Sequence, residues 1–149
     1  MVRFWEDFRV GDVVELGPVT VSEEEIVEFA SRFDPQPFHL DAEAGRRTPY
    51  GGLIASGWHS AAIYMGMFVR GVLDGTASLG SPGVEELRWL APVRPGDRLR
   101  GRAVITDVVP SATSPHRGTI IGTHELINQD DVVVMRFRSR VFIARRPTA

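Results

Sequence analysis

The sequence predicts an α+β domain in which one long apolar helix is wrapped by a curved antiparallel sheet of about five strands. Three observations predict this fold class. A nearly uninterrupted apolar stretch follows Gly52, four long segments with strand character follow Gly83, and the connections between those segments are too short for crossover helices. Because no internal repeat or linker interrupts this order, residues 1–149 are expected to form a single domain.

The composition is that of a globular protein and excludes several kinds of chemistry. Of the 149 residues, 43% are hydrophobic and 24% are charged, the balance of one domain with a core of its own. The chain contains no Cys, which excludes disulfides, thiol nucleophiles and cysteine metal sites. All 17 basic residues are Arg, which excludes a Schiff-base lysine and a P-loop lysine. The net charge of -2 argues against a nucleic-acid partner.

The hydropathy pattern gives no sign of a membrane segment. No stretch reaches the roughly 18 uncharged apolar residues that a membrane-spanning helix needs. The first ten residues carry two acids and two arginines where a signal peptide would have an apolar core. We therefore expect no membrane association and a cytoplasmic location.

The first elements along the chain are a strand and a helix. The segment Val13–Val21 is rich in Val and Leu and predicts an extended segment with a break at Gly17-Pro18. Ser22 followed by Glu25 fits a capping box, and the apolar residues that follow have helical spacing. A short helix is therefore expected at about residues 23–33.

A stiff loop and a buried helix are expected next. Pro35 and Pro37 disfavour a helix and bias their preceding residues toward extended conformations, so Asp34–His39 should be a stiff loop. The stretch from Gly52 to about Leu73 has the pattern of the longest helix. A helix that is apolar nearly all round is buried. Its few polar positions are Ser56, His59, Ser60 and Arg70.

The C-terminal half changes to the pattern of strands. Turn residues such as Pro, Gly, Ser and Asp separate the segments. In the last segment Arg136, Arg138 and Arg140 alternate with mostly apolar residues, which predicts one solvent-facing side. A curved antiparallel sheet around one long helix is the hotdog fold. The four expected strands are Val84–Ala91, Asp97–Val109, Arg117–Asn128 and Val132–Ala144.

Two side chains in the Pro-rich loop have the chemistry of a general acid and base. Asp34 and His39 are five residues apart on a chain stiffened by two prolines, so both side chains can converge on one point. A carboxylate and an imidazole that share a water molecule typically contribute about 10² to 10⁴ each in rate. The alternative is an Asp-Pro turn beside a helix end, with His39 in a structural role.

Gly57 stands where the buried helix begins. Free backbone N–H groups at a helix N-terminus can stabilise an oxyanion, and one such donor contributes roughly 3 to 4 kcal/mol to transition-state stabilisation. Gly57 and Ala61 share one helix face, so close packing of the sheet against the helix is the alternative. When Gly57 is considered apart from the neighbouring motif, close packing is the better explanation.

The segment Asp34-Pro35-Gln36-Pro37-Phe38-His39-Leu40-Asp41 resembles the Asp-x-Asn-Pro-x-His-x-Asp signature of the MaoC-like hydratase/dehydratase family, which includes the R-specific enoyl-CoA hydratases. Three further segments resemble landmarks of the family in the same order, and the likeness covers nearly the whole chain. They are Glu6–Asp12 for its opening, Ile54–Gly57 for its Ile-x-His-Gly helix start, and Leu90–Asp97 for its Pro-Val-x-x-Gly-Asp turn.

The resemblance implies a hotdog fold, a homodimer or higher homo-oligomer, and hydration of a trans-2-enoyl thioester to an (R)-3-hydroxyacyl thioester, or the reverse dehydration. It implies that Asp34 and His39 hold the water, taking one proton and delivering another, while the Gly57 N–H stabilises the enolate oxygen. The acyl group would be carried on coenzyme A or on an acyl carrier protein, with no further cofactor.

Two positions beside this pair depart from the family pattern. Gln36 stands where the signature has Asn, and Ser56 stands where the helix start has His. We expect both to contact the substrate. His59 is expected either to line the acyl pocket or to satisfy a buried backbone group. No metal site is expected, because no second His or carboxylate stands at ligand spacing on one helix.

Two other functions are compatible with the sequence. Hotdog domains also hydrolyse acyl-CoA, and fold alone does not decide between the two reactions. Such thioesterases place a catalytic carboxylate on or next to the central helix, whereas Gly51–Leu73 contains no Asp or Glu. The third class is a non-catalytic subunit that binds acyl thioesters and keeps the motif by descent.

Overall fold

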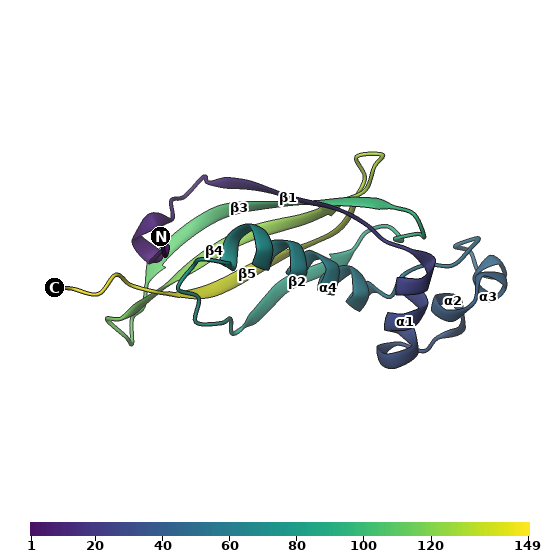
Figure 1. The fold of residues 1–149 in the computed structure, drawn as a ribbon, viewed down its shortest axis with the longest axis horizontal. Coiled ribbons are helices and arrows are strands. Elements are labelled where there is room, and N and C mark those ends of the chain that lie inside the picture. The colour runs from purple at the N-terminus through teal and green to yellow at the C-terminus, as the bar shows by residue number, and fades with distance from the viewer.

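The computed structural model describes all 149 residues and shows a five-stranded antiparallel sheet that curves around one central helix (Figure 1). Its strands are β1 Val13–Thr20, β2 Gly83–Trp89, β3 Arg98–Pro110, β4 Arg117–Ile127 and β5 Val133–Ala144. The order in the sheet is β1-β3-β4-β5-β2, so β1 and β2 are the two edges. Every neighbouring pair is antiparallel. The predicted fold class and strands are confirmed.

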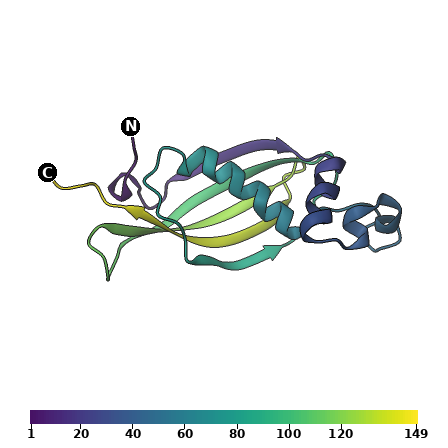
Figure 2. The ribbon, with the colours of Figure 1, turned by 60° about the horizontal axis from the view of Figure 1, so that its bottom comes forward.

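The helices are unevenly distributed over this sheet. The four α-helices are α1 Glu23–Phe33, α2 Pro37–Leu40, α3 Ala42–Arg46 and α4 Gly57–Phe68. A 3-10 turn, η1 Trp5–Asp7, and a π-helical turn, η2 Val69–Leu73, complete the helical elements. Helix α4 lies across the sheet, and the other three helices gather at the end where α4 begins (Figure 2). None of the helices combines the length with the apolar composition that a membrane span requires.

Helix α1 has the bounds and the cap that the sequence predicts. The Ser22 hydroxyl accepts a hydrogen bond from the Glu25 N–H at 3.1 Å, and the Glu25 carboxylate accepts one from the Ser22 N–H at 3.3 Å. Two donors at the helix start are thereby satisfied. Ile26 and Ala30 form the buried face and anchor α1 to the rest of the protein.

The segment expected to be a loop is partly helical, so that expectation is wrong after Gln36. Pro37 occupies the first turn of α2, where no backbone N–H is needed and the fixed φ of Pro suits a helix. Asp34 ends α1, and His39 lies within α2. The imidazole is therefore carried on a helical turn instead of a loop.

The central helix is shorter at its start than predicted. Residues 52–56 are not helical, because the Ile54 N–H donates to the Phe38 carbonyl oxygen at 3.2 Å and the Ala55 N–H donates to the Val93 carbonyl oxygen at 2.8 Å. These two bonds hold the segment against α2 and the chain after β2. The helix therefore begins at Gly57 and changes to the π-helical turn after Phe68.

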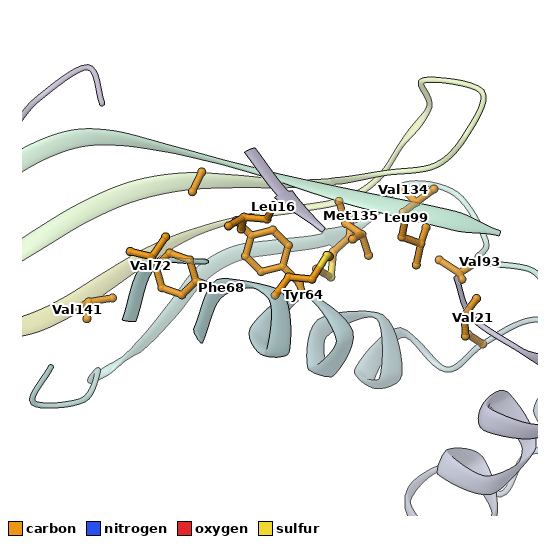
Figure 3. Packing of buried hydrophobic residues seen from close by; sticks show 14 of the residues in the cluster. Leu16, Val21, Tyr64, Phe68, Val72, Val93, Leu99, Val134, Met135 and Val141 are labelled. Carbon is orange, nitrogen blue, oxygen red and sulfur yellow. The ribbon is translucent and has the colours of Figure 1, made fainter. Parts of the chain in front are cut away.

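Helix α4 is buried on one side only, so the expectation that it is buried all round is wrong. Tyr64 is almost fully buried in the core between the helix and the sheet (Figure 3), and Met67 is equally buried. On the other side, Trp58 and Met65 are 58% and 49% exposed. An apolar helix face is thus left open beside the edge strand β2.

Candidate active site

A groove opens where α1 and α2 meet the start of α4 and the end of β2. Its volume is about 460 Å³, and its lining includes Asp34, His39 and Gly57, the three residues that the sequence suggests for catalysis. The end of α1, the turn of α2 and the start of α4 each supply one of them. The fold therefore brings the three predicted residues to one place.

The orientation of His39 is fixed by a backbone contact. Its Nδ1 lies 2.7 Å from the carbonyl oxygen of Ile54, which can only accept, so Nδ1–H is the donor. In the neutral imidazole this leaves Nε2 as an acceptor. Nε2 lies 3.3 Å from Oδ2 of Asp34, and the His39 side chain is 6% exposed. A neutral His39 thus presents its basic nitrogen to the carboxylate.

Asp34 receives two hydrogen bonds from side chains. The Ser56 hydroxyl donates to Oδ2 at 2.7 Å, and the Gln36 amide donates to Oδ1 at 2.7 Å. The Ser56 hydrogen bond is the main cause that lowers the pKa of Asp34; Gln36 and nearby His39 add to it, and partial burial opposes it. Asp34 is therefore a carboxylate at neutral pH.

This pair is suited to hold one water molecule. When His39 is neutral, its Nε2 and the Asp34 carboxylate are both acceptors, 3.3 Å apart. A water molecule beside them can donate one hydrogen to each. Its oxygen lone pairs then point away from the pair, toward the groove, which is the orientation of a nucleophile.

The two departures from the family signature contact Asp34, although the sequence suggested contacts to the substrate. Ser56 is fully buried and does not line the groove, so it cannot reach a ligand there. Gln36 does line the groove, but its amide nitrogen is engaged by the carboxylate. Both residues therefore orient the Asp34 carboxylate and stabilise its charged form.

Gly57 has the features that both interpretations of the sequence require, an oxyanion donor and a site of close packing. It is the first residue of α4, and neither its N–H nor that of Trp58 donates to an acceptor of the protein. A side chain at this position would overlap the Trp89 indole, which packs against the glycine. The missing side chain thus permits close packing and also leaves an N–H free in the groove.

His59 does not line the groove and lies against α1. Its ring stacks on Phe29 of α1, with centroids 4.7 Å apart and an interplanar angle of 7°. Its Nδ1 has no hydrogen-bond partner, and burial lowers the pKa of this imidazole. His59 therefore packs α4 against α1 and satisfies no backbone group through Nδ1.

Two aromatic residues of the groove are not evident from the sequence. Trp58 and Trp89 form an edge-to-face pair with centroids 5.1 Å apart, on the side of the groove formed by α4 and β2. No local pattern pairs a residue of the helix with one that ends a strand thirty-one positions later. No group of three or more His, Cys, Asp or Glu residues lies close enough together to bind a metal ion.

Known proteins share this fold and sequence pattern. The model of the MaoC like domain family matches residues 7–124. The (R)-specific enoyl-CoA hydratase of Rhodospirillum rubrum is 32% identical over 115 residues, which cover 74% of each chain. The uncharacterised protein YdeM of Bacillus subtilis is 27% identical over 140 residues, covering 94% of this chain and 98% of YdeM.

A solved structure extends the likeness to the whole chain. The crystal structure of the MaoC-like dehydratase from Rhodospirillum rubrum superposes with a TM-score of 0.89 at 41% sequence identity. The match covers 98% of this chain and 99% of that one. The hotdog fold expected from the sequence is thereby confirmed.

Proposed function

Because the chain belongs to the MaoC-like domain family, we propose that it hydrates a trans-2-enoyl thioester to an (R)-3-hydroxyacyl thioester, or catalyses the reverse dehydration. The observation that carries this proposal is the pair of acceptors, Asp34 Oδ2 and His39 Nε2, which lie 3.3 Å apart. Both residues line the same groove as Gly57, whose N–H is unpaired. A water nucleophile and an oxyanion donor are thus available to one substrate.

These positions support the following reaction. The thioester carbonyl oxygen accepts a hydrogen bond from the Gly57 N–H, which draws electrons away from the double bond. The water held by Asp34 and His39 attacks the β-carbon and gives one proton to the pair, while the π electrons move to the carbonyl oxygen. The enolate then takes a proton from the pair at the α-carbon, and the thioester bond stays intact.

The acyl chain of this substrate needs an apolar site next to the groove. A second cavity of about 330 Å³ lies between α4 and β2, and most of its lining residues are hydrophobic. Trp58 lines both this cavity and the groove, so the two spaces adjoin. We assign the second cavity to the acyl chain, with the thioester on coenzyme A or on an acyl carrier protein.

The protein is expected to act as a homodimer. Strand β2 is an edge of the sheet with an unpaired side, and Val84, Trp89 and Leu90 are exposed on or just after it. Exposed Trp58 and Met65 of α4 lie beside them around the acyl cavity. A second copy would cover these apolar side chains and the free edge.

Sedimentation equilibrium should give twice the 16.5 kDa of one chain, and a 16.5 kDa species at micromolar concentration would reject the dimer.

The proposed reaction is tested by identifying its product. The purified protein is incubated with a panel of trans-2-enoyl-CoA and 3-hydroxyacyl-CoA thioesters, and the products are separated on a chiral phase. We expect the (R)-3-hydroxyacyl thioester from at least one enoyl substrate, and none from the Asp34→Asn variant. Formation of the S product, or an equal yield from the variant, would reject the proposed chemistry.

A further inference from the structure

Three polar side chains form a hydrogen-bonded chain inside the apolar core. The Tyr64 hydroxyl lies 2.6 Å from Nδ1 of His124, and Nε2 of His124 lies 2.5 Å from the Ser139 hydroxyl. The Tyr64 hydroxyl is also 3.3 Å from the carbonyl oxygen of Arg102. Tyr64 points from α4 into the core (Figure 3), and the other two side chains come from β4 and β5. The proposed reaction uses none of them.

This chain of hydrogen bonds ends at the wall of the acyl cavity. His124 and Ser139 both line that cavity, and they also line a second, smaller cavity of about 190 Å³ on the side of η1 and β1. Ser139 is 8% exposed, so it is nearly buried yet still reaches this space. A polar group therefore stands in the wall of a mainly apolar cavity.

Ser139 has hydrogen-bonding capacity that the protein does not use. Burial lowers the pKa of His124 to about 4, so its ring is neutral at pH 7 and has a single N–H. If Tyr64 donates to Nδ1, then Nε2–H donates to Ser139, whose own O–H has no acceptor. If Tyr64 donates to Arg102 instead, Ser139 donates to Nε2 and keeps its oxygen lone pairs free. The shorter Tyr64–His124 distance favours the first arrangement.

The spacing of Gly57 and Tyr64 on α4 gives an approximate distance between the groove and this chain of hydrogen bonds. Tyr64 follows Gly57 by seven residues on α4, which is roughly 10 Å along the helix axis. An extended chain advances about 1.25 Å per carbon–carbon bond, so about eight to nine carbons cover that distance. An acyl chain whose carbonyl oxygen contacts Gly57 would thus reach the polar group near its eighth carbon.

We propose that Ser139, oriented by His124 and Tyr64, recognises an oxygen atom near the far end of a medium-length acyl chain. The preferred substrates would be enoyl thioesters that carry a hydroxyl or keto group at that end. A hydroxyl can both donate to and accept from Ser139, whereas an unsubstituted chain would leave its remaining hydrogen-bonding capacity unused. This inference rests on the proposed function, because it takes the cavity to hold the acyl chain.

Binding of unreactive thioesters tests this inference separately from turnover. Calorimetry compares saturated omega-hydroxyhexanoyl-, omega-hydroxyoctanoyl- and omega-hydroxydecanoyl-CoA with hexanoyl-, octanoyl- and decanoyl-CoA. We expect the octanoyl derivative with the hydroxyl to bind at least about tenfold tighter than octanoyl-CoA. Ser139→Ala should abolish this preference, so that the two octanoyl thioesters bind with equal affinity within about twofold. Saturated thioesters cannot be hydrated, so a failure of the reaction does not affect this result.

A serine in the same cavity provides the control. Ser78 lines the cavity but has no side-chain hydrogen bond to the network, so Ser78→Ala should keep the preference. If Ser139→Ala does not fold, Ser139→Cys, which keeps the volume but hydrogen-bonds weakly, must also reduce the preference. Equal affinities of the wild-type protein for both kinds of thioester would overturn the inference. A preference that persists in Ser139→Ala, or one that is lost in Ser78→Ala, would also overturn the inference.

Discussion

Ser56 donates its hydroxyl hydrogen to Oδ2 of Asp34 across 2.7 Å. Ser56 is fully buried at the position before α4, so it contacts the carboxylate from the interior and leaves the groove side free. The same oxygen lies 3.3 Å from Nε2 of His39. The charge of the proposed catalytic pair is therefore set by a residue that departs from the family signature.

The first prediction concerns the pH dependence of the reaction. Because Ser56 lowers the pKa of Asp34 by stabilising its charged form, Ser56→Ala should raise this pKa toward its ordinary value. The reaction needs ionised Asp34, so the acidic limb of the kcat/KM profile should move to higher pH. Gln36→Ala should move it in the same direction by less, because Gln36 is a smaller cause.

A similar hydrogen bond elsewhere provides the control for this shift. The Gln129 amide donates to Asp97 at 3.0 Å outside the groove, so Gln129→Ala should leave the profile in place. An acidic limb that stays fixed in Ser56→Ala, or that moves further in Gln36→Ala, would contradict the assignment of Asp34.

The second prediction concerns the catalytic pair itself. Asp34→Asn and His39→Ala should each lower kcat by at least about 100-fold, since each removes a general acid or base. Their combined loss should be far smaller than the product of the two, because both act on one water molecule. Steady-state kinetics of the double variant measures this non-additivity.

A nearby carboxylate serves as the control for loss of charge. Asp41 accepts a hydrogen bond from the Ala44 N–H as the cap of α3 and does not line the groove. Asn also caps helices well, so Asp41→Asn should keep wild-type turnover and stability. If Asp34→Asn retained more than about a tenth of kcat, the loss would be too small for a general acid or base.

The third prediction concerns the close packing of Gly57 against Trp89. In Gly57→Ala the new methyl group overlaps the Trp89 indole, so this ring must move and the groove must change shape. We expect at least a tenfold loss of kcat/KM (about 1.4 kcal/mol) together with a change in tryptophan fluorescence. In Gly52→Ala the nearest atom would be the Arg94 side chain at 3.6 Å, so neither quantity should change. Equal behaviour of the two variants would contradict this account.

The fourth prediction concerns stability in acid. The pKa of His124 is lowered to about 4 by burial, whereas in the unfolded chain it is near 6.5. Between these values the unfolded chain binds a proton that the folded protein does not, so stability falls as the pH falls. The free energy of unfolding should decrease by up to about 3 kcal/mol over this range because of His124 alone.

Urea denaturation at a series of pH values measures this effect. His124→Gln lacks the titrating group, so its free energy of unfolding should fall less between pH 6.5 and 4 than that of the wild-type protein. Burial also lowers the pKa of His59, and this contribution is present in both proteins. Equal slopes for the two proteins would show that His124 is not buried as described.

The elements that the sequence predicts well are those whose signals are local. Alternating side chains defined the strands, and the capping box of Ser22 and Glu25 defined the start of α1. The start of α4 could not be predicted, because it depends on bonds from Ile54 and Ala55 to residues distant in the chain. The helical turn at Pro37 is not predicted, because two nearby prolines usually indicate a loop. Pro37 is nevertheless well suited to the first turn of a helix.

The site shows the same limit. The convergence of Asp34 and His39 followed from five-residue spacing, and the family resemblance gave its chemical meaning. The contact from Ser56 to Asp34 spans twenty-two residues, so no local pattern contains it. Likewise, the stacking of His59 on Phe29 depends on how α1 packs against α4.

The most direct test of the proposed reaction follows the double bond and the thioester at the same time. Crotonyl-CoA and longer or branched trans-2-enoyl-CoA thioesters are incubated with the protein, while enone absorbance and free thiol are recorded together. If Asp34 and His39 direct water to the β-carbon, the enone absorbance of at least one substrate falls and no thiol appears. Release of thiol across the panel, without loss of the enone from any member, would identify a thioesterase and contradict the account.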